Sequence, residues 1–279
     1  MTSSFMDELP FVKMSGSGND FILVDNRSRA LDESDLTGFI AAICRRRLSV
    51  GADGVILIEA SETADFRWRF FNADGSSAEM CGNGARCAAR FACLSEICGP
   101  QVRFETGAGV VEAQVDGVRV KVKMTDPRDL RLDIPIPLAS GSLIGCSINT
   151  GVPHVVVLGA GVEDLDVAGR GREIRFHTQF APAGINVDFI CPELPGAIAI
   201  RTYERGVEAE TLACGTGAVA GALVAACKLG LASPVRVRTR SGEYLTVYFE
   251  GNGGRFCEVY QEGEARLIYR GVLHPEAWQ

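Results

Sequence analysis

The sequence lacks any apolar run long enough to cross a membrane. Its apolar stretches are interrupted by Gly, Arg or Lys well before the roughly 20 residues that a transmembrane helix requires. The N-terminal segment MTSSFMDELPF has neither the basic nor the apolar part of a secretory signal. We therefore expect a cytoplasmic protein with no membrane partner, in which residues 1–10 form a loose leader.

An excess of positive charge is also missing. The chain has 28 Lys and Arg against 35 Asp and Glu, a formal net charge of −7. Proteins that bind nucleic acids usually carry a basic surface, so no nucleic-acid partner is expected. The 279 residues are 47% hydrophobic and 23% charged, which excludes disorder and fits one large domain or two smaller ones.

Histidine is scarce and cysteine is abundant, with 3 and 10 residues respectively. No CxxC pair occurs, which argues against a zinc site or a thioredoxin-like motif, so no metal is expected. A disulfide framework is not expected without an export signal. Most of these thiols should therefore be small buried side chains.

The chain contains one internal repeat. Cys81 in MCGNGARC and Cys214 in ACGTGAVA are separated by 133 residues, and an alternating strand pattern begins 21 residues after each. Upstream, residues 17–25 align with 151–159. Residues 51–59 align with 185–193, which pairs Asp53 with Asp188. The order of these matches predicts two homologous domains related by a pseudo-twofold axis.

The repeat and its periodicity predict an α+β fold. Residues 215–229 are small or apolar around the whole helical circumference, so this helix should be buried on all sides. Each domain is expected to be a mixed β-sheet rolled around such a helix. The first domain comprises residues 1–124 plus 265–279, and the second comprises 125–264. Linker signals lie in 125–137, and the last strand, 265–273, could pair in either half.

The two repeated cysteines suggest acid–base chemistry. Cys81 and Cys214 each begin a helix and precede Gly-x-Gly, where free backbone N–H groups bind anions and favour a thiolate. One substrate carboxylate could lie between two such helices, with its α-carbon between the sulfurs. One thiolate would remove the α-proton and the opposite thiol would return one, as in a two-base racemase or epimerase. A lone cysteine at a helix start is usually structural, and Cys87, Cys93, Cys98 and Cys227, which have no repeated partner, are interpreted in that way.

Other polar residues gather beside these motifs, each with a plainer alternative. Arg205 could bind a second carboxylate through a bidentate contact, or could simply pair with Glu204 on the surface. His154 could orient a thiol or be structural. Asn19 and Asn186 could line the domain openings or be ordinary turn residues. Asn72, Asp74 and Ser76 precede Cys81.

Five segments carry a family resemblance: SGSGNDFILVDNR, FFNADGSSAEMCGNGARC, NTGVPH, GINVDF and YERGVEAETLACGTGA. Through these segments the chain resembles diaminopimelate epimerase, and the match is spread from about residue 11 to 273. The resemblance implies interconversion of LL- and meso-diaminopimelate in lysine and peptidoglycan-precursor biosynthesis. It also implies a homodimer and no pyridoxal phosphate, metal or other cofactor.

The resemblance also implies roles for individual residues. Cys81 and Cys214 would be the acid–base pair. Glu204 would bind near the reacting amino group, and His154 would lie close to the cysteines. The distal end of the substrate would be held by Asn19, Asn72, Asn186 and Arg205. The reacting carboxylate would be held by Gly82, Asn83, Gly215 and Thr216. The chain departs from some members at Gly54, where they have Gln, and at Val152, where they have Asn.

Four alternatives remain open. A proline racemase or hydroxyproline epimerase also uses two cysteines, but Asn72, Asn186 and Arg205 favour a substrate with a second carboxylate and amine. A phenazine-type isomerase lacks the cysteine pair. From other classes, the chain could be a redox-sensing dithiol protein or an amino acid-binding protein without turnover.

Overall fold

The computed structural model describes residues 9–29, 31, 36–139, 141–159, 161–193 and 195–279. Residues 1–8 of the expected leader lie outside the described residues, whereas Leu9 and Pro10 already belong to the first strand. The chain divides into two compact units, Met1–Val122 with Glu264–Gln279, and Lys123–Gly263. The role of each as an epimerase domain carrying one reactive cysteine stays a prediction.

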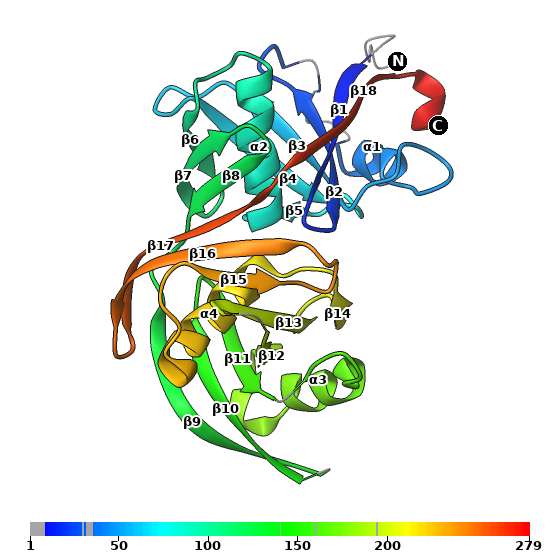
Figure 1. The fold of residues 1–279 in the computed structure, drawn as a ribbon. Helices are drawn as coiled ribbons and strands as arrows, with labels where there is room; N and C mark the ends of the chain where they lie inside the picture. The colour runs from blue at the N-terminus through cyan, green and yellow to red at the C-terminus, as the bar shows by residue number, and fades with distance from the viewer. Residues whose placement is uncertain (1–8, 30, 32–35, 140, 160, 194) are drawn as a thin grey trace. The chain divides into compact units, whose positions relative to one another are not determined.

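Unit 1 is a mixed sheet with two α-helices (Figure 1). Its elements are β1 (Leu9–Gly16), β2 (Asn19–Asp25), α1 (Leu36–Ile43), β3 (Gly54–Glu59), β4 (Phe66–Asn72), β5 (Ser77–Ala78), α2 (Gly82–Leu94), β6 (Gln101–Thr106), β7 (Gly109–Asp116), β8 (Arg119–Lys123), β18 (Arg266–Leu273) and the short helix η3 (Pro275–Ala277). The pairs β2–β3 and β4–β6 are parallel. The pairs β18–β1, β1–β2, β3–β4, β4–β5, β6–β7 and β7–β8 are antiparallel.

Unit 2 follows the same order. Its elements are β9 (Arg128–Leu138), β10 (Gly141–Asn149), β11 (Pro153–Leu158), α3 (Val167–Arg175), η2 (Thr178–Phe180), β12 (Asn186–Pro192), β13 (Ala197–Glu204), β14 (Ala209–Thr211), α4 (Gly215–Leu229), β15 (Val235–Arg238), β16 (Tyr244–Asn252) and β17 (Arg255–Glu264). Here β11–β12 and β13–β15 are the parallel pairs, and β9–β10, β10–β11, β12–β13, β13–β14, β15–β16 and β16–β17 are antiparallel. Strand for strand, this repeats unit 1, as expected for a duplicated domain.

Each unit packs one helix against each face of its sheet. In unit 1, α2 belongs to a core with Phe21, Ile56 and Phe104, whereas α1 packs on the opposite face. In unit 2, α4 and α3 divide the sheet in the same way. Every residue of α4 from Gly217 to Ala225 is buried, because glycine and alanine let the strands approach on all sides. The predicted α+β class, with a mixed sheet around a buried helix, is confirmed.

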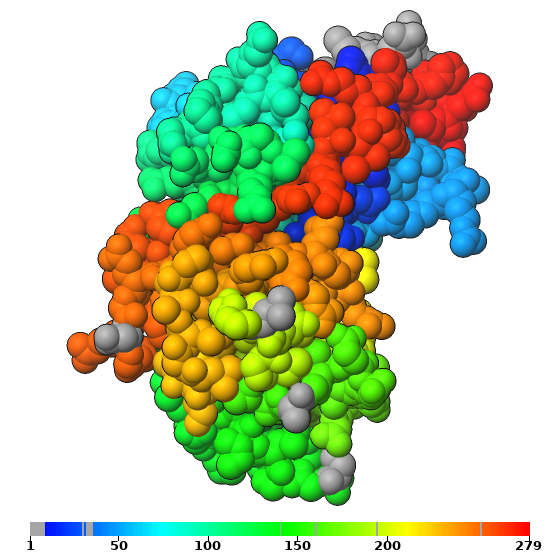
Figure 2. All heavy atoms as spheres, viewed as in Figure 1, coloured from blue at the N-terminus to red at the C-terminus, as the bar shows by residue number. Residues whose placement is uncertain are grey.

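Two expectations about the ends of the units need correction or completion. The predicted linker at 125–137 is mostly strand β9, which pairs with β10 from Leu138 to Arg128. The strand predicted at 265–273, which could have paired in either half, pairs with β1 in unit 1. Its orange-red atoms lie at the surface in Figure 2. Ile268, Tyr269 and Val272 of this strand are exposed.

The structure also corrects the alignment within the repeat. A Cβ on Gly84, three residues after Cys81, would meet the Ile56 side chain at 3.3 Å. A Cβ on Gly217, three residues after Cys214, would meet the Asp188 carboxylate at 2.4 Å. Asp188 therefore corresponds to Ile56, and pairing it with Asp53 was wrong. A polar side chain has taken the place of an apolar one beneath the helix.

We expect Ala222→Leu to destabilise the protein by about 1–3 kcal/mol, because Ala222 is fully buried in α4 and the strands around it leave no room for three more carbons. Urea unfolding followed by circular dichroism measures the loss. Ala232→Leu adds the same atoms at an exposed position and should change stability by less than about 0.5 kcal/mol. Equal loss in both variants would contradict the tight packing of α4.

Candidate functional site

The predicted site residues of each unit lie at one edge of its sheet, beside the start of the core helix. In unit 1, Asn19 begins β2 and Asn72 ends β4. In unit 2, Asn186 begins β12 and Glu204 ends β13. Because β3 and β4, like β12 and β13, are antiparallel, a strand start and a strand end meet at this edge. The fold therefore places each set at the strand ends of one unit.

Cys81 caps the N-terminus of α2. Its Sγ accepts a hydrogen bond from Gly84 N at 3.4 Å, and the side chain is half-buried. The first helical backbone bond runs from Ala85 N to Cys81 O at 2.8 Å. The N–H groups of Gly82 and Asn83 therefore precede the regular helical bonding and suit an anion.

Asn83 and Asn19 are held by a chain of polar contacts. Asn83 Nδ2 donates to Asn19 Oδ1 at 2.7 Å, and Asn19 Nδ2 donates to Asp53 Oδ2 at 3.0 Å. Arg86, fully buried on α2, donates to Asn83 Oδ1 at 2.8 Å and to Ser17 Oγ at 2.9 Å. These contacts fix both amide orientations, because each amide oxygen accepts and each nitrogen donates.

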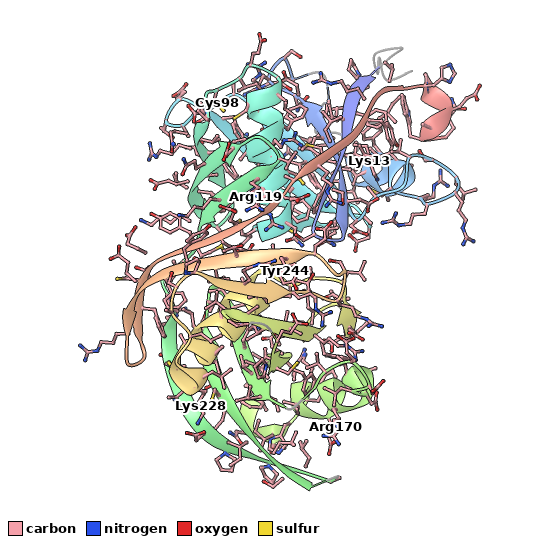
Figure 3. The ribbon with its side chains drawn as sticks, in the orientation of Figure 1. Lys13, Cys98, Arg119, Arg170, Lys228 and Tyr244 are labelled. Carbon is pink, nitrogen blue, oxygen red and sulfur yellow. The ribbon has the colours of Figure 1, made fainter. Side chains whose placement is uncertain are left out.

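An ionic cluster contacts Asp53, the carboxylate at the end of this chain of hydrogen bonds. Lys13, labelled in Figure 3, lies 2.8 Å from Asp20, and Arg46 pairs with both Asp20 and Asp53. Burial alone would raise the pKa of Asp20, but hydrogen bonds from Arg46 and Lys13 outweigh it and lower that pKa. The Asp20 carboxylate therefore stays ionised and keeps accepting hydrogen bonds.

Asn72 is exposed and stands apart from the Asn19 chain. Its Nδ2 donates to Ser76 Oγ at 3.0 Å, and Ser76 in turn donates to Asp74. At Gly54, the partner of Asn72 in β3, a Cβ would lie 2.5 Å from Phe71 O. This close approach explains why the chain has glycine there, since no larger residue fits this backbone.

Cys214 caps α4 in a different environment. Its Sγ lies 3.5 Å from Thr216 Oγ1, and the residue is buried. Burial raises the pKa of the thiol well above its ordinary value, and the nearby Glu204 and Asp188 carboxylates raise it further. A hydrogen bond between Cys214 and Thr216 and one from the Gly217 N–H oppose this shift without overcoming it. The expectation that the helix start lowers this pKa was therefore wrong for Cys214.

His154 links Thr216 to a buried carboxylate. Its Nε2 lies 2.9 Å from Thr216 Oγ1, and its Nδ1 lies 2.7 Å from Asp188 Oδ2. Thr202 Oγ1 donates to Asp188 Oδ1 at 2.7 Å, and His154 and Asp188 are fully buried. The predicted proximity of His154 to a cysteine therefore takes the form of an indirect contact to Cys214 through Thr216.

Glu204, Arg205 and Asn186 form the other side of this site. Thr211 donates to Glu204, and burial raises the pKa of the Glu204 carboxyl, with Asp188 adding to the shift. Asn186 Oδ1 accepts from Arg205 N at 2.8 Å. Within the described part of the chain, no carboxylate pairs with the Arg205 guanidinium. The surface pair between Arg205 and Glu204, considered from the sequence, is therefore not formed.

Several residues of these sites were not singled out from the sequence. Arg86, Asp53, Thr202 and Asp188 complete the hydrogen-bond chains, and Gln261 Nε2 donates to Gly215 O at 2.6 Å. Arg86 could have been found as the one charged residue inside the otherwise small helical segment 82–89. Asp188 interrupts an apolar strand, which is a similar signal.

The other end of each core helix lacks this chemistry. Cys98 and Lys228, labelled in Figure 3, lie near the C-terminal ends of α2 and α4, away from Cys81 and Cys214. Lys228 pairs with Asp133 at 2.6 Å. Cys93 donates to Gly99 O at 3.0 Å, consistent with a structural thiol.

Two further surveys cover the described residues. In those ranges, no three His, Cys, Asp or Glu side chains are grouped so that they could hold a metal ion. None of the helices that the structure describes is both long enough and apolar enough to span a bilayer.

Comparison with solved structures identifies the fold. A phenazine biosynthesis protein of the PhzF family from Bacillus anthracis matches with a TM-score of 0.73 at 18% identity, over 96% of this chain and 99% of that one. A probable proline racemase from Agrobacterium radiobacter matches with a TM-score of 0.69 at 17% identity, over 97% and 95%. At such identities the likeness establishes the fold alone.

Sequence comparison identifies the family. The sequence model of diaminopimelate epimerase matches residues 11–130 and 146–268. The diaminopimelate epimerase of Aquifex aeolicus is 46% identical, over 96% of this chain and 99% of its own length. That of Methanothrix thermoacetophila is 40% identical, over 98% and 99%. The chain therefore belongs to the diaminopimelate epimerase family, and it is an isomerase of the amino acid epimerase type.

Proposed function

We propose that this protein interconverts LL- and meso-diaminopimelate by a cofactor-independent, two-base mechanism in which Cys81 and Cys214 are the catalytic residues. The observation that carries the proposal is the repeated placement of a cysteine as the cap of a buried helix, in two sites of matching topology. A cysteine kept at this position in both copies, amid diverged neighbours, is more than a packing residue.

The proton balance of the reaction is simple. A thiolate removes the α-proton and becomes a thiol, while the substrate carbon keeps the electron pair as a carbanion. The opposite thiol gives its proton to the other face of that carbon and becomes a thiolate. The product has inverted configuration, and one thiol and one thiolate remain with their roles exchanged.

The helix starts supply the stabilisation that this carbanion needs. Negative charge spreads onto the carboxylate as the α-proton leaves, and backbone N–H groups at a helix start favour that charge. In the proposal these donors come from Gly82, Asn83, Gly215 and Thr216. Glu204 would hold the reacting amino group beside Cys214, and His154 would act through Thr216.

The distal amino acid end of the substrate requires a cation and several amides. Arg205 has a guanidinium without a carboxylate partner among the described residues, and its backbone is fixed by Asn186. In the proposal Arg205 binds the second carboxylate, while Asn19, Asn72 and Asn186 contact the distal amine and carboxylate. A cyclic imino acid such as proline offers nothing for this set to bind.

The proposal also covers the biological setting. The reaction would supply meso-diaminopimelate for lysine and peptidoglycan-precursor biosynthesis in the cytoplasm. The enzyme would act as a homodimer, which light scattering coupled to size-exclusion chromatography would test.

We expect Cys81→Ser and Cys214→Ser each to lower kcat for epimerisation by at least about 10³-fold, because each face of the α-carbon needs a competent proton donor or acceptor. Proton NMR of reduced protein with LL-diaminopimelate in D₂O measures loss of the α-proton signal and appearance of the meso isomer. L-proline and hydroxyproline, offered in parallel, should not exchange.

The matched controls are Cys98→Ser and Cys257→Ser, one in each unit and neither at a helix start. Both should keep wild-type turnover. Full activity in Cys81→Ser would rule out the two-base assignment. Exchange of the α-proton of proline but not of diaminopimelate would show that the protein is a proline racemase instead.

We expect Arg205→Met to raise KM for diaminopimelate by about 10- to 100-fold with a smaller effect on kcat, because a charge-assisted contact to the distal carboxylate is lost. Initial rates over a range of substrate concentrations give both constants. Arg170→Met removes an exposed arginine of α3, labelled in Figure 3, and should leave both constants unchanged. An unaltered KM in Arg205→Met would place the distal carboxylate elsewhere.

A further inference from the structure

The two cysteine sites differ in what lies beneath the helix start. In unit 1, the side chains of Phe21, Ile56 and Phe70 belong to the apolar core. In unit 2, the corresponding strand positions next to the start of α4 carry polar residues instead. These residues are His154, Asp188 and Thr202, all buried and joined by hydrogen bonds. A buried polar cluster costs free energy unless every group is satisfied, and this one is connected up to Cys214.

The Asp188 carboxylate sets the direction of every bond in this chain. A carboxylate only accepts, so Thr202 donates to Oδ1 and His154 Nδ1–H donates to Oδ2. With its proton on Nδ1, neutral His154 has a free electron pair on Nε2, which accepts the Thr216 hydroxyl proton. The Thr216 oxygen is then left to accept the S–H of Cys214. Each of the four donors points along the chain toward Asp188.

We propose that Asp188 is a positioning residue that fixes the orientation and tautomer of His154, so that the Thr216 hydroxyl relays the Cys214 proton to His154 Nε2. This inference rests on the proposed function of Cys214. It gives Cys214 a proton store that is reached through the Thr216 hydroxyl.

The transfer balances without any outside reagent. The Cys214 S–H bond breaks as its proton bonds to the Thr216 oxygen, and the original Thr216 proton moves to Nε2. The result is a thiolate, an intact hydroxyl, an imidazolium and the unchanged Asp188 carboxylate. The reverse transfer restores the thiol. The imidazolium forms next to a carboxylate 2.7 Å away, which stabilises it.

The charged groups around Cys214 come from three strands. His154 lies on β11, Asp188 on β12 and Glu204 on β13. The two carboxylates and burial raise the pKa of the thiol, so Cys214 rests protonated. A thiol that rests protonated requires an internal acceptor before it can act as a base.

Gly217 gives independent support for the fixed place of Asp188. A Cβ there would lie 2.4 Å from Asp188 Oδ1, whereas a Cβ on Gly84 in unit 1 would meet no atom closer than the end of the Ile56 side chain, at 3.3 Å. The carboxylate is thus seated against the first turn of α4, next to the cap formed by Cys214.

The test is Asp188→Asn, read by kinetics and by alkylation. The amide would donate to His154 Nδ1, which moves the imidazole proton to Nε2 and turns the Thr216 hydroxyl toward Cys214. We expect kcat to fall by about 10²-fold with KM nearly unchanged, because Nε2 can no longer accept the proton. We also expect the pH midpoint for alkylation of Cys214 by iodoacetamide to fall by about one unit, because a negative charge is lost.

Peptide mass spectrometry reads each cysteine separately, so the Cys81 profile serves as an internal reference and should not move. A larger thiolate fraction of Cys214 together with a lower kcat is a result that a merely structural defect does not produce. Asp53→Asn removes a carboxylate from unit 1 and should leave the Cys214 profile at its wild-type midpoint. Wild-type kcat in Asp188→Asn, an unmoved Cys214 midpoint, or equal movement of both cysteines would overturn the proposal.

A second pair of variants covers the case in which Asp188→Asn does not fold. Thr216→Val removes the relaying hydroxyl and should lose about the same factor in kcat, whereas Thr216→Ser keeps the hydroxyl and should retain turnover. Equal loss in both would overturn the relay. If the wild-type protein failed to epimerise diaminopimelate, the proposed function would fail, yet the alkylation shift would still report on the hydrogen-bond chain.

Discussion

The burial of one helix in each unit is the constraint on which the rest of the structure depends. A helix enclosed by strands on all sides needs small residues. In α4 these are mainly glycine and alanine, and α2 has glycine and alanine together with one buried arginine, Arg86. Its first N–H groups still need partners, because a buried unpaired donor is costly. The helix start therefore opens at a sheet edge, where strand ends bring asparagine, glutamate and histidine to it. The packing that buries the helix therefore also brings the polar side chains to its start.

The two sites use different electrostatics on the same scaffold. Unit 1 fixes its amides through Asp53, in a cluster where Asp20 and Asp53 pair with Lys13 and Arg46. Unit 2 buries its thiol and places two carboxylates near it, which raises the pKa of Cys214. The residues beneath the helix start separate these two environments, because unit 2 has His154, Asp188 and Thr202 at the strand positions where unit 1 has Phe21, Ile56 and Phe70. The two units thus share one strand topology but differ in the charged groups around the cysteine.

Much of this arrangement could be predicted from the sequence. The helix expected at 215–229 has those bounds, and the alternating segment 235–238 is β15. The register could not be predicted, because a strand repeats every two residues and a small shift changes the face of each side chain. The segment 125–137 looks like a linker because its proline and aspartate residues suit loops, but β9 is largely exposed and tolerates them. The raised pKa of Cys214 depends on burial and on Asp188, neither of which the Cys-Gly motif reveals.

The pairing of β18 with β1 has a consequence for how the chain folds during synthesis. Unit 2 is continuous in sequence, whereas unit 1 contains β1 near the N-terminus and β18 near the C-terminus. The first half of the chain therefore emerges from the ribosome without its last strand and must wait, with one edge of β1 unpaired. The second half has everything it needs once residue 263 has emerged. The unit that is translated first is thus completed last.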